Sequence, residues 1–572
     1  MVSKRAEPLR RTVIGFTLLA AAAIQMAQAQ LAFNNHPSSV EDVEGATVFL
    51  SGFPSNFSPE LNFQWLKDGI RLEGATKSSL QITLSADTAG VYVLTVTDGV
   101  NTAESEAATV LLASLSPATT EFIKVVDTTD VMPGLAPRKF GVLRDGRLRN
   151  GVTTIAGTDT FESAGGVFRY EGGVGTPILT ESDSLPGFAI PATFFGSKTV
   201  LDDGAVHMFV TSNPDADAVI DEFAVLGWRD GELSIVADEQ TKIPNKASAT
   251  FEGLGWPYRA MGRTAFLGRG LGADLPDKVG YRGAFILDEN GLNVWADNDT
   301  PLPAGDGVWN GNSAQVGFDG ETLAFWATDG SHQNGIFVTK NAGPLKKAAF
   351  KGDLIPGTSI ELEGFMSPPV VSDGRLLFVG RTSDFSQNYL LELSGSDLRI
   401  LTKSGDPILG GGLGLGRVTH WFEPAADGSV IFTSHGPGQK QGIYRLTEGS
   451  IEPILTTLNS INGVRLQGVS LRDVDRDSLL AELRFEDGVS GYYTASLDLE
   501  STSPPSPDTV PETPLPTMLE VAINEGSMTI EWEGSGILES SFDLDRWVVE
   551  PGVSPIVIEF LAGQRFFRVR VE

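Results

Sequence analysis

The chain has 572 residues, which is too long for a single hydrophobic core, so several domains are expected. It contains 65 glycines, 32 prolines and no cysteine. This composition favours strands and turns, and it excludes a disulfide framework, a thiolate metal site and a cysteine nucleophile. The formal net charge of -31 argues against nucleic acid or an anionic membrane as a partner.

Residues 1–29 have the pattern of a secretory signal peptide. A positively charged start is followed by an apolar segment at 13–24 and by Ala27-Gln-Ala29, a small-x-small cleavage site. The apolar segment is too short to span a bilayer comfortably, and no other apolar run is long enough. We therefore expect a secreted, cell-surface or periplasmic protein without a membrane span. The choice between general and twin-arginine export stays open.

Residues 31–114 resemble an immunoglobulin-like domain of the intermediate type. Trp65-Leu-Lys-Asp68-Gly69 matches the strand of the buried tryptophan, and Asp87-Thr-Ala-Gly90-Val-Tyr92 matches the tyrosine corner. The two usual cysteine positions fall near Gly52 and at Leu94. The resemblance implies a two-sheet sandwich in which Trp65 and Tyr92 are core and corner residues. Packing must then replace the missing cross-link.

An internal repeat runs through residues 120–498. Its clearest piece is a loop that reads Asp, two residues, Pro, Gly, as in Asp130-Val-Met-Pro133-Gly134. Successive copies are anchored at Pro133, Pro186, Pro244, Pro303, Pro356, Leu409 and Asn462. The steps between these anchors are 53, 58, 59, 53, 53 and 53 residues, a period typical of propeller blades.

Each repeat also contains a turn glycine before an apolar strand and a glycine–aliphatic–aromatic triplet, such as Gly335-Ile-Phe337. The strands are continuously apolar, which predicts sheets covered on both faces, as in stacked blades. The repeats resemble an exported bacterial tandem-repeat family named for an Asn-x-x-Gly-x-x-Ala-Phe motif. Gly262 and Ala265-Phe266 fit its second half, whereas Arg259 stands at the asparagine position. The resemblance implies a fold and carries no catalytic residues.

The last repeat enters a proline-rich segment without its final strand and loop. Both pieces occur at the other end of the array, as the strand 121–126 and the loop that starts at Asp130. Two unpaired edges would remain unless residues 121–126 join the unit at 463–498. The sequence therefore predicts a seven-bladed β-propeller at 120–498 that is closed by strand 121–126.

Residues 499–517 form a Pro/Ser/Thr-rich linker, which is stiff and unable to pack. Short strands are expected in residues 518–572, which resemble a small C-terminal β module of large secreted bacterial proteins. The predicted fold class is all-β, with an immunoglobulin-like sandwich, a seven-bladed β-propeller and a small C-terminal β module.

Two features carry possible chemistry. Asp473, Asp475 and Asp477 have the spacing of a calcium loop, but a solvated turn is the favoured interpretation, and calcium binding stays open. The aromatic residues near the predicted blade connections could stack on sugars or peptides, although packing between blades is favoured. They are Trp256, Tyr258, Trp309, Trp421 and Phe422.

No catalytic, cofactor-binding or metal-binding residue is assigned. The domain order favours a secreted or cell-surface binding or adhesion protein, a monomer whose partner is an extracellular glycan or protein. One alternative is an extracellular hydrolase or lyase on polysaccharide, with its site in the propeller funnel. Another is a structural spacer. The sequence favours a protein without enzymatic activity but does not decide this.

Overall fold

The computed structural model describes residues 31–55, 61–160, 164–186, 194–212, 222–246, 248–271, 280–303, 310–328, 334–383, 387–409, 412–435, 441–497 and the C-terminal strands given below. The predicted signal peptide and the linker 499–517 lie outside these residues. Every regular element in the described ranges is a β-strand, so the all-β prediction is confirmed. Within the same ranges no helix has the length and apolar character needed to cross a membrane.

The chain divides into two compact units, Met1–Leu499 and Glu500–Glu572. In the second unit the strands form two small antiparallel sheets. One has the order β43 (Leu519–Asn524), β44 (Ser527–Trp532), β47 (Ile556–Glu559), and the other β46 (Val548–Val549), β45 (Gly536–Ser541), β48 (Phe566–Val571). Three of these strands fall on predicted ones, whereas the strand expected at 543–547 lies outside the described residues.

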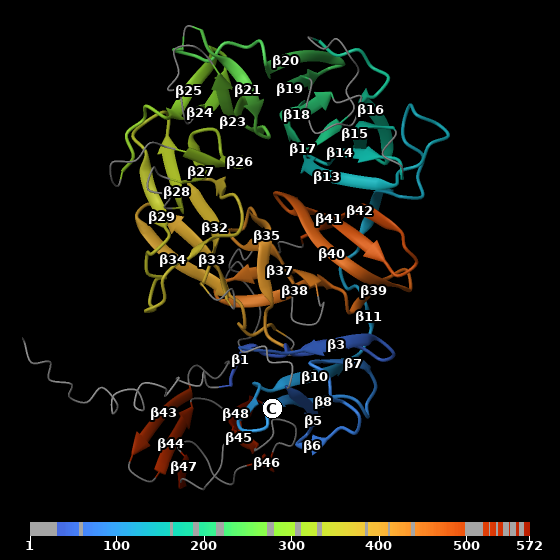
Figure 1. Cartoon of the computed structure of the whole chain (residues 1–572), viewed down its shortest axis with the longest axis vertical. Helices are drawn as coiled ribbons and strands as arrows, with labels where there is room; N and C mark the ends of the chain where they lie inside the picture. Colours follow the sequence, from blue (N-terminus) through green and yellow to red (C-terminus); the bar gives the residue numbers. More distant parts are fainter. Residues whose placement is uncertain are drawn as a thin grey trace, which may run out of the picture. The chain divides into compact units, whose positions relative to one another are not determined.

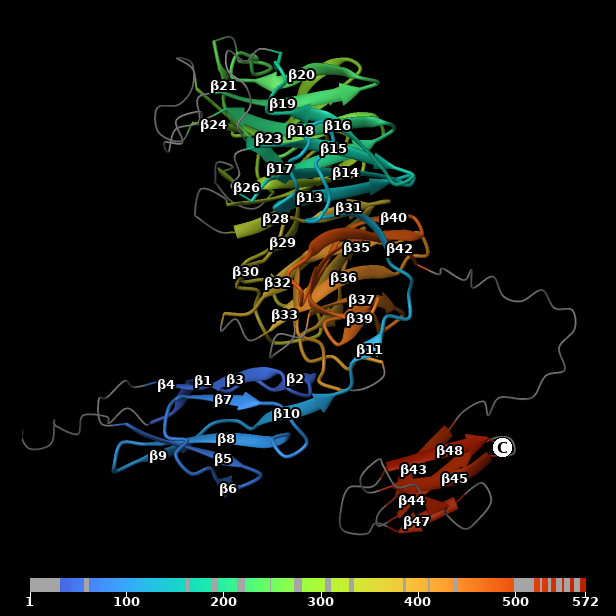
Figure 2. The same cartoon turned by 90° about the vertical axis from the view of Figure 1, so that its right-hand side faces the viewer.

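The first unit begins with a two-layer sandwich. One layer has the order β2 (Val40–Val43), β10 (Ala108–Ala113), β8 (Gly90–Thr97), β5 (Asn62–Lys67), β6 (Ile70–Arg71), with β9 (Thr102–Glu104) beside β8. The other holds β3 (Thr47–Ser51) and β7 (Ser79–Thr83), and β1 (Phe33–Asn35) pairs with β4 (Phe53–Pro54). Figure 2 shows β3 and β7 facing β5 and β8.

Trp65 and Tyr92 stabilise the sandwich, as the sequence predicts. Trp65 is fully buried, and its indole Nε1 donates to the Lys77 carbonyl at 2.9 Å. The Tyr92 hydroxyl donates to the Thr88 carbonyl at 2.6 Å, which is the tyrosine-corner contact. A Cβ placed on Gly52 would lie 3.0 Å from Leu94 Cδ2. Leu94 therefore fills the space of the absent disulfide, and apolar packing replaces the cross-link.

Seven consecutive sheets, antiparallel except for one short pair in the last, follow within the described part of the first unit, and we number them in chain order (Figure 1). The first is β13 (Val142–Arg149), β14 (Val152–Thr158), β15 (Gly165–Glu171), β16 (Val174–Thr180). The second is β17 (Phe194–Asp202), β18 (Ala205–Ser212), β19 (Glu222–Arg229), β20 (Glu232–Asp238). The third is β21 (Thr250–Leu254), β22 (Tyr258–Ala260), β23 (Arg263–Leu271), β24 (Tyr281–Asp288), β25 (Gly291–Asp297).

The remaining four sheets repeat this plan. The fourth is β26 (Asn310–Phe318), β27 (Thr322–Thr328), β28 (Asn334–Lys340), β29 (Lys346–Phe350). The fifth is β30 (Gly364–Phe365), β31 (Val370–Ser372), β32 (Arg375–Arg381), β33 (Asn388–Ser394), β34 (Asp397–Lys403). The sixth is β35 (Arg417–Pro424), β36 (Val430–His435), β37 (Gln441–Thr447), β38 (Ser450–Thr456). The seventh contains β40 (Val464–Asp475), β41 (Ser478–Phe485) and β42 (Ser490–Ser496).

The seventh sheet is completed by strands from the beginning of the array. β12 (Ile123–Asp127) pairs antiparallel with β42, so the pairing predicted for 121–126 is present. On the other side, β11 (Ser116–Pro117) pairs with β39 (Asn459–Ile461), which in turn pairs with β40. The segment that leaves the sandwich is thus part of the seventh sheet.

A separate apolar core lies between each sheet and the next. The third and fourth sheets, for example, bury Phe325 and Phe337 together with Ala284. One such core also joins the two ends of the array, with Leu480 and Tyr492 of the seventh sheet against Phe168 and its neighbours in the first. This two-sided burial explains why the strands are continuously apolar.

The repeated loop has one structural task in all seven copies. The side-chain oxygen of its first residue accepts the backbone N–H three residues earlier, as Asp183 does from Thr180 at 2.7 Å. The seven acceptors are Asp130, Asp183, Thr241, Thr300, Asp353, Asp406 and Asn459. The fifth residue has a positive φ wherever it is described, at Gly134, Asn245, Gly357 and Gly463, which explains the glycine.

The glycine–aliphatic–aromatic triplet follows from the same packing. Residues i and i+2 of a strand share a face, so the ring lies over its own glycine. A Cβ on Gly283 would lie 2.9 Å from the Phe285 ring, and one on Gly442 would lie 2.8 Å from Tyr444. A larger residue would displace a core aromatic side chain.

Candidate functional site

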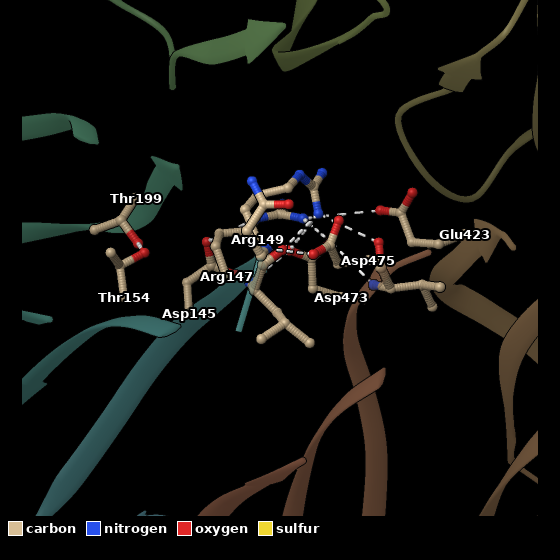
Figure 3. A network of polar contacts seen from close by, with 11 residues as sticks. Asp145, Arg147, Arg149, Thr154, Thr199, Glu423, Asp473 and Asp475 are labelled. Atoms are coloured by element: carbon tan, nitrogen blue, oxygen red, sulfur yellow. Dashed lines mark hydrogen bonds and ion pairs between the residues drawn. The ribbon is translucent and has the colours of Figure 1, made fainter. Parts of the chain in front are cut away.

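A cluster of charged side chains lies where the first strands of the first, sixth and seventh sheets meet (Figure 3). We call it the seam cluster, because it joins the two ends of the array. It consists of Asp145, Arg147 and Arg149 on β13, Glu423 on β35 and Asp473 on β40. Figure 3 shows the two arginines directed at the carboxylates of the other two sheets.

Irregular pairing sets the directions of these side chains. The register of β13 against β14 shifts between Arg144 and Gly146, and that of β40 against β41 shifts between Leu471 and Asp473. A bulge of this kind bends a strand and redirects a side chain. Gly146 also permits a close approach, because a Cβ there would lie 2.8 Å from Leu480 Cδ2 of the seventh sheet.

Asp473 is the centre of the cluster. Its side chain is only 1% exposed. Its Oδ2 accepts from the Leu148 backbone N–H at 2.7 Å and from Arg149 at 3.1 Å. Its Oδ1 accepts from the Val474 N–H at 3.1 Å and lies 3.5 Å from Arg147. Both oxygens are therefore engaged, and this buried charge is compensated as burial demands.

Arg147 is surrounded by carboxylates from three strands. Its side chain lies 3.5–3.8 Å from Asp145, Glu423 and Asp473. Burial by itself lowers the pKa of the Arg147 guanidinium, but Asp145 and Asp473 outweigh this effect and raise the pKa above its ordinary value. The Arg149 pKa is raised in the same way, chiefly by Asp473 against burial. Both arginines stay charged in the interior.

The charges of the seam cluster also affect the pKa of Tyr258, which lies on β22 of the third sheet. Burial is the main cause that raises the pKa of Tyr258 to about 12, and Glu423 acts in the same direction. Arg147 and Arg149 act in the opposite direction. Strands of the first, third, sixth and seventh sheets, β13, β22, β35 and β40, therefore bring polar groups to one place.

The three aspartates with the spacing of a calcium loop make different contacts. The solvated-turn prediction is wrong for Asp473, which is a buried strand residue. Asp475 accepts from the Asn150 backbone N–H in the first sheet. The turn itself is formed by Arg476, with φ of 54°, and Asp477. Among the described residues no group of three histidines or carboxylates is placed to hold a metal ion.

The aromatic residues follow the packing interpretation where they are described. Trp421 packs beside the core of the sixth and seventh sheets, and the Arg472 guanidinium lies 4.4 Å from its ring centroid. Tyr258 packs beside the core of the third and fourth sheets, and Phe422 is buried between the fifth and sixth. Trp256 is half-buried, and Trp309 lies outside the described residues.

Sequence reasoning missed Arg147, Arg149 and Glu423. Asp145-Gly146 has the composition of a turn, yet it lies within β13. The signal available was Arg147-Leu-Arg149, two charges at the spacing of one strand face. The two arginines lie 326 and 324 positions from Asp473 along the chain, so no local pattern could have paired them.

The model of a protein family described as "Family of unknown function (DUF7453)" matches residues 310–479. This segment covers the fourth, fifth and sixth sheets and part of the seventh. A search of curated proteins finds no match.

Two solved structures are similar to the chain over long stretches. One is a mutant of AofleA from Arthrobotrys oligospora with three arginines replaced by alanine, at 9% identity and a TM-score of 0.25, covering 65% of this chain and 88% of that one. The other is the insect immune protein hemolin, at 13% identity and a TM-score of 0.15, covering 76% of this chain and all of that one. At these scores neither carries an argument about fold or function here.

Proposed function

We propose that the chain is an exported, non-catalytic binding protein, secreted or held at the cell surface. In this proposal the seven sheets form a closed seven-bladed β-propeller of the degenerate tandem-repeat type, preceded by an intermediate-type immunoglobulin-like domain. The core between the seventh and first sheets and the pairing of β12 with β42 support closure. A monomer that presents loops to an extracellular glycan or protein fits this domain order.

The observation that carries the proposal is the state of Asp473. A catalytic carboxylate must face its substrate with an oxygen free to accept or deliver a proton. Both oxygens of Asp473 instead accept hydrogen bonds, from backbone N–H groups and from an arginine of the first sheet. We therefore assign the buried charges to holding the two ends of the array together. Ligand recognition is then the task of the loops.

One observation favours the enzymatic alternative. Glu423 has a side chain 17% exposed, and it affects the pKa of Tyr258. A glutamate that raises the pKa of a partly buried tyrosine could serve as a general acid in polysaccharide cleavage. We keep a hydrolase or lyase acting through Glu423 as the second candidate.

A glycan and protein array, run beside a panel of polysaccharide hydrolase and lyase assays on the exported chain, separates the candidates. We expect a bound ligand without turnover, and ligand binding unchanged in Glu423→Gln. Turnover that Glu423→Gln abolishes would establish the enzymatic alternative. A chain that neither binds nor cleaves anything would support the structural spacer. Fractionation of cells that express the chain with and without residues 1–29 tests export separately.

A further inference from the structure

We propose that a groove between the outer strands of the first and second sheets binds a neutral sugar residue, with the Asp183 carboxylate as its principal acceptor. The proposal deepens the binding function proposed above and rests on it. The groove has a volume of about 480 Å³, within the range of small-molecule sites.

The groove is built from repeated parts. It is lined by β16 and by two successive copies of the repeated loop, at Gly134-Leu135 and at 182–184. The β19–β20 hairpin closes it with Gly231 and Leu233. Leu135, Pro177 and Leu233 supply apolar surface, whereas the second loop supplies hydroxyl groups and a carboxylate.

The Asp183 carboxylate is held in a fixed direction. Its Oδ2 accepts from the Thr180 backbone N–H at 2.7 Å and from the Thr180 hydroxyl at 2.9 Å. Both contacts are made by Oδ2, and Asp183 is exposed and lines the groove. An ionised carboxylate can only accept hydrogen bonds, so its natural ligands are donors such as adjacent hydroxyl groups.

Two other copies of the loop differ from this one in the charge near the carboxylate. Asp130 and Asp353 each form an ion pair with a lysine six residues earlier, Lys124 at 3.0 Å and Lys347 at 2.5 Å. The position six residues before Asp183 is Pro177, at the same register beside a bulge in the outer strand. This copy therefore has a proline ring where two of the other copies have a cation.

A sugar residue matches these surfaces together. Its hydroxyl groups can donate to Asp183 and exchange hydrogen bonds with the exposed Ser182 and Ser184. Its C–H faces can pack on Pro177 and Leu233. An anionic ligand would be repelled by the carboxylate.

The test is titration of the full chain with methyl glycosides of neutral hexoses, 6-deoxyhexoses and N-acetylhexosamines, followed by ligand-observed NMR. We expect at least one glycoside to bind. Asp183→Asn should weaken it at least tenfold and still fold, because Asn459 makes the same backbone contact in the seventh sheet. Pro177→Lys should weaken binding similarly, by placing a lysine where Lys124 and Lys347 stand.

The matched control is Asp406→Asn, which makes the same change in a loop that does not line this groove. Binding that responds equally to Asp183→Asn and Asp406→Asn, or to neither, overturns the groove. It leaves the binding function intact if the glycan array still shows a ligand. Binding that disappears in EDTA and returns with Ca²⁺ overturns direct recognition by the carboxylate. A chain that binds no glycoside and no arrayed glycan refutes both proposals.

Discussion

Two interfaces between sheets of the array are stabilised by different kinds of interaction. The third and fourth sheets meet through apolar side chains, among them Phe325 and Phe337 with ring centroids 6.0 Å apart. The first and seventh sheets share an apolar core too, but they add the buried charges of the seam cluster. Apolar contact is non-directional, whereas a buried ion pair is stable only in one geometry.

The difference follows from distance along the chain. The third and fourth sheets are neighbours in sequence, so a short connection already brings them together. The Leu148–Asp473 bond joins residues 325 positions apart, and ordering a loop of that length costs entropy. We infer that charges at the seam fix the register between the first and seventh sheets, which apolar burial alone would specify weakly.

The largest expected effect comes from deletion of residues 115–134. It removes β12 and leaves the edge of β42 unpaired, and it also removes β11 from β39. The array should lose its single cooperative unfolding transition in calorimetry. A deletion inside the linker 499–517 is the control and should leave that transition in place. An unchanged transition after the first deletion would show that β12 is dispensable for cooperative unfolding of the array.

Asp473→Ala tests the seam directly. The substitution removes the carboxylate that Arg149 and the buried Arg147 share, although Arg147 keeps Asp145 and Glu423. Removing one partner of a buried ion pair typically costs about 3–5 kcal/mol. Urea denaturation should show this loss as a lower midpoint. The control is Asp475→Ala, which removes one contact to the Asn150 backbone and should cost only about 1 kcal/mol. Equal effects of the two substitutions would contradict the central role of Asp473.

Trp65→Ala tests the sandwich of residues 31–114. The buried indole is expected to contribute about 3–5 kcal/mol to the sandwich, with no disulfide to compensate for its loss. Calorimetry should show destabilisation of the transition of residues 31–114. A seven-sheet transition that moves by the same amount would mean that sandwich and array unfold as one body.

How far the sequence predicted the molecule depends on the range of each interaction. Trp65, Tyr92 and the seven loop anchors act through contacts close in sequence or through a well-known motif, and the structure has each in the predicted place. The β12–β42 pairing was also predictable, because an incomplete repeat at each end leaves complementary edges.

The seam cluster was not predictable in the same way. Asp473 lies in a segment that aligns with exposed turns of other repeats, so a solvated position was expected. Its burial depends on two strand bulges and on arginines from the opposite end of the array. Neither a bulge position nor a charge pairing over such a separation leaves a periodic signal in one sequence.

A smaller effect tests whether His207, a polar residue between the second and third sheets, is charged in the folded chain. His207 on β18 is buried, and its Nδ1 lies 3.0 Å from the Thr264 hydroxyl of the third sheet. Burial, with Arg259 and Arg229 in the same direction, lowers the pKa of His207 to about 3. The folded chain thus keeps this imidazole neutral at pH values where the unfolded chain, with a pKa near 6.5, binds a proton.

The sign of the pH dependence follows. Between pH 6.5 and about 3 the unfolded state holds the extra proton, so stability is complete above pH 6.5 and falls as the pH falls. At pH 5 the loss from this residue should be about 2 kcal/mol. Urea midpoints at pH 7 and pH 5 measure it, with His207→Asn as the comparison, since an amide can keep the contact to Thr264 without titrating. The drop in stability should be about 2 kcal/mol smaller in the variant. An equal drop would mean that His207 is charged in the folded state.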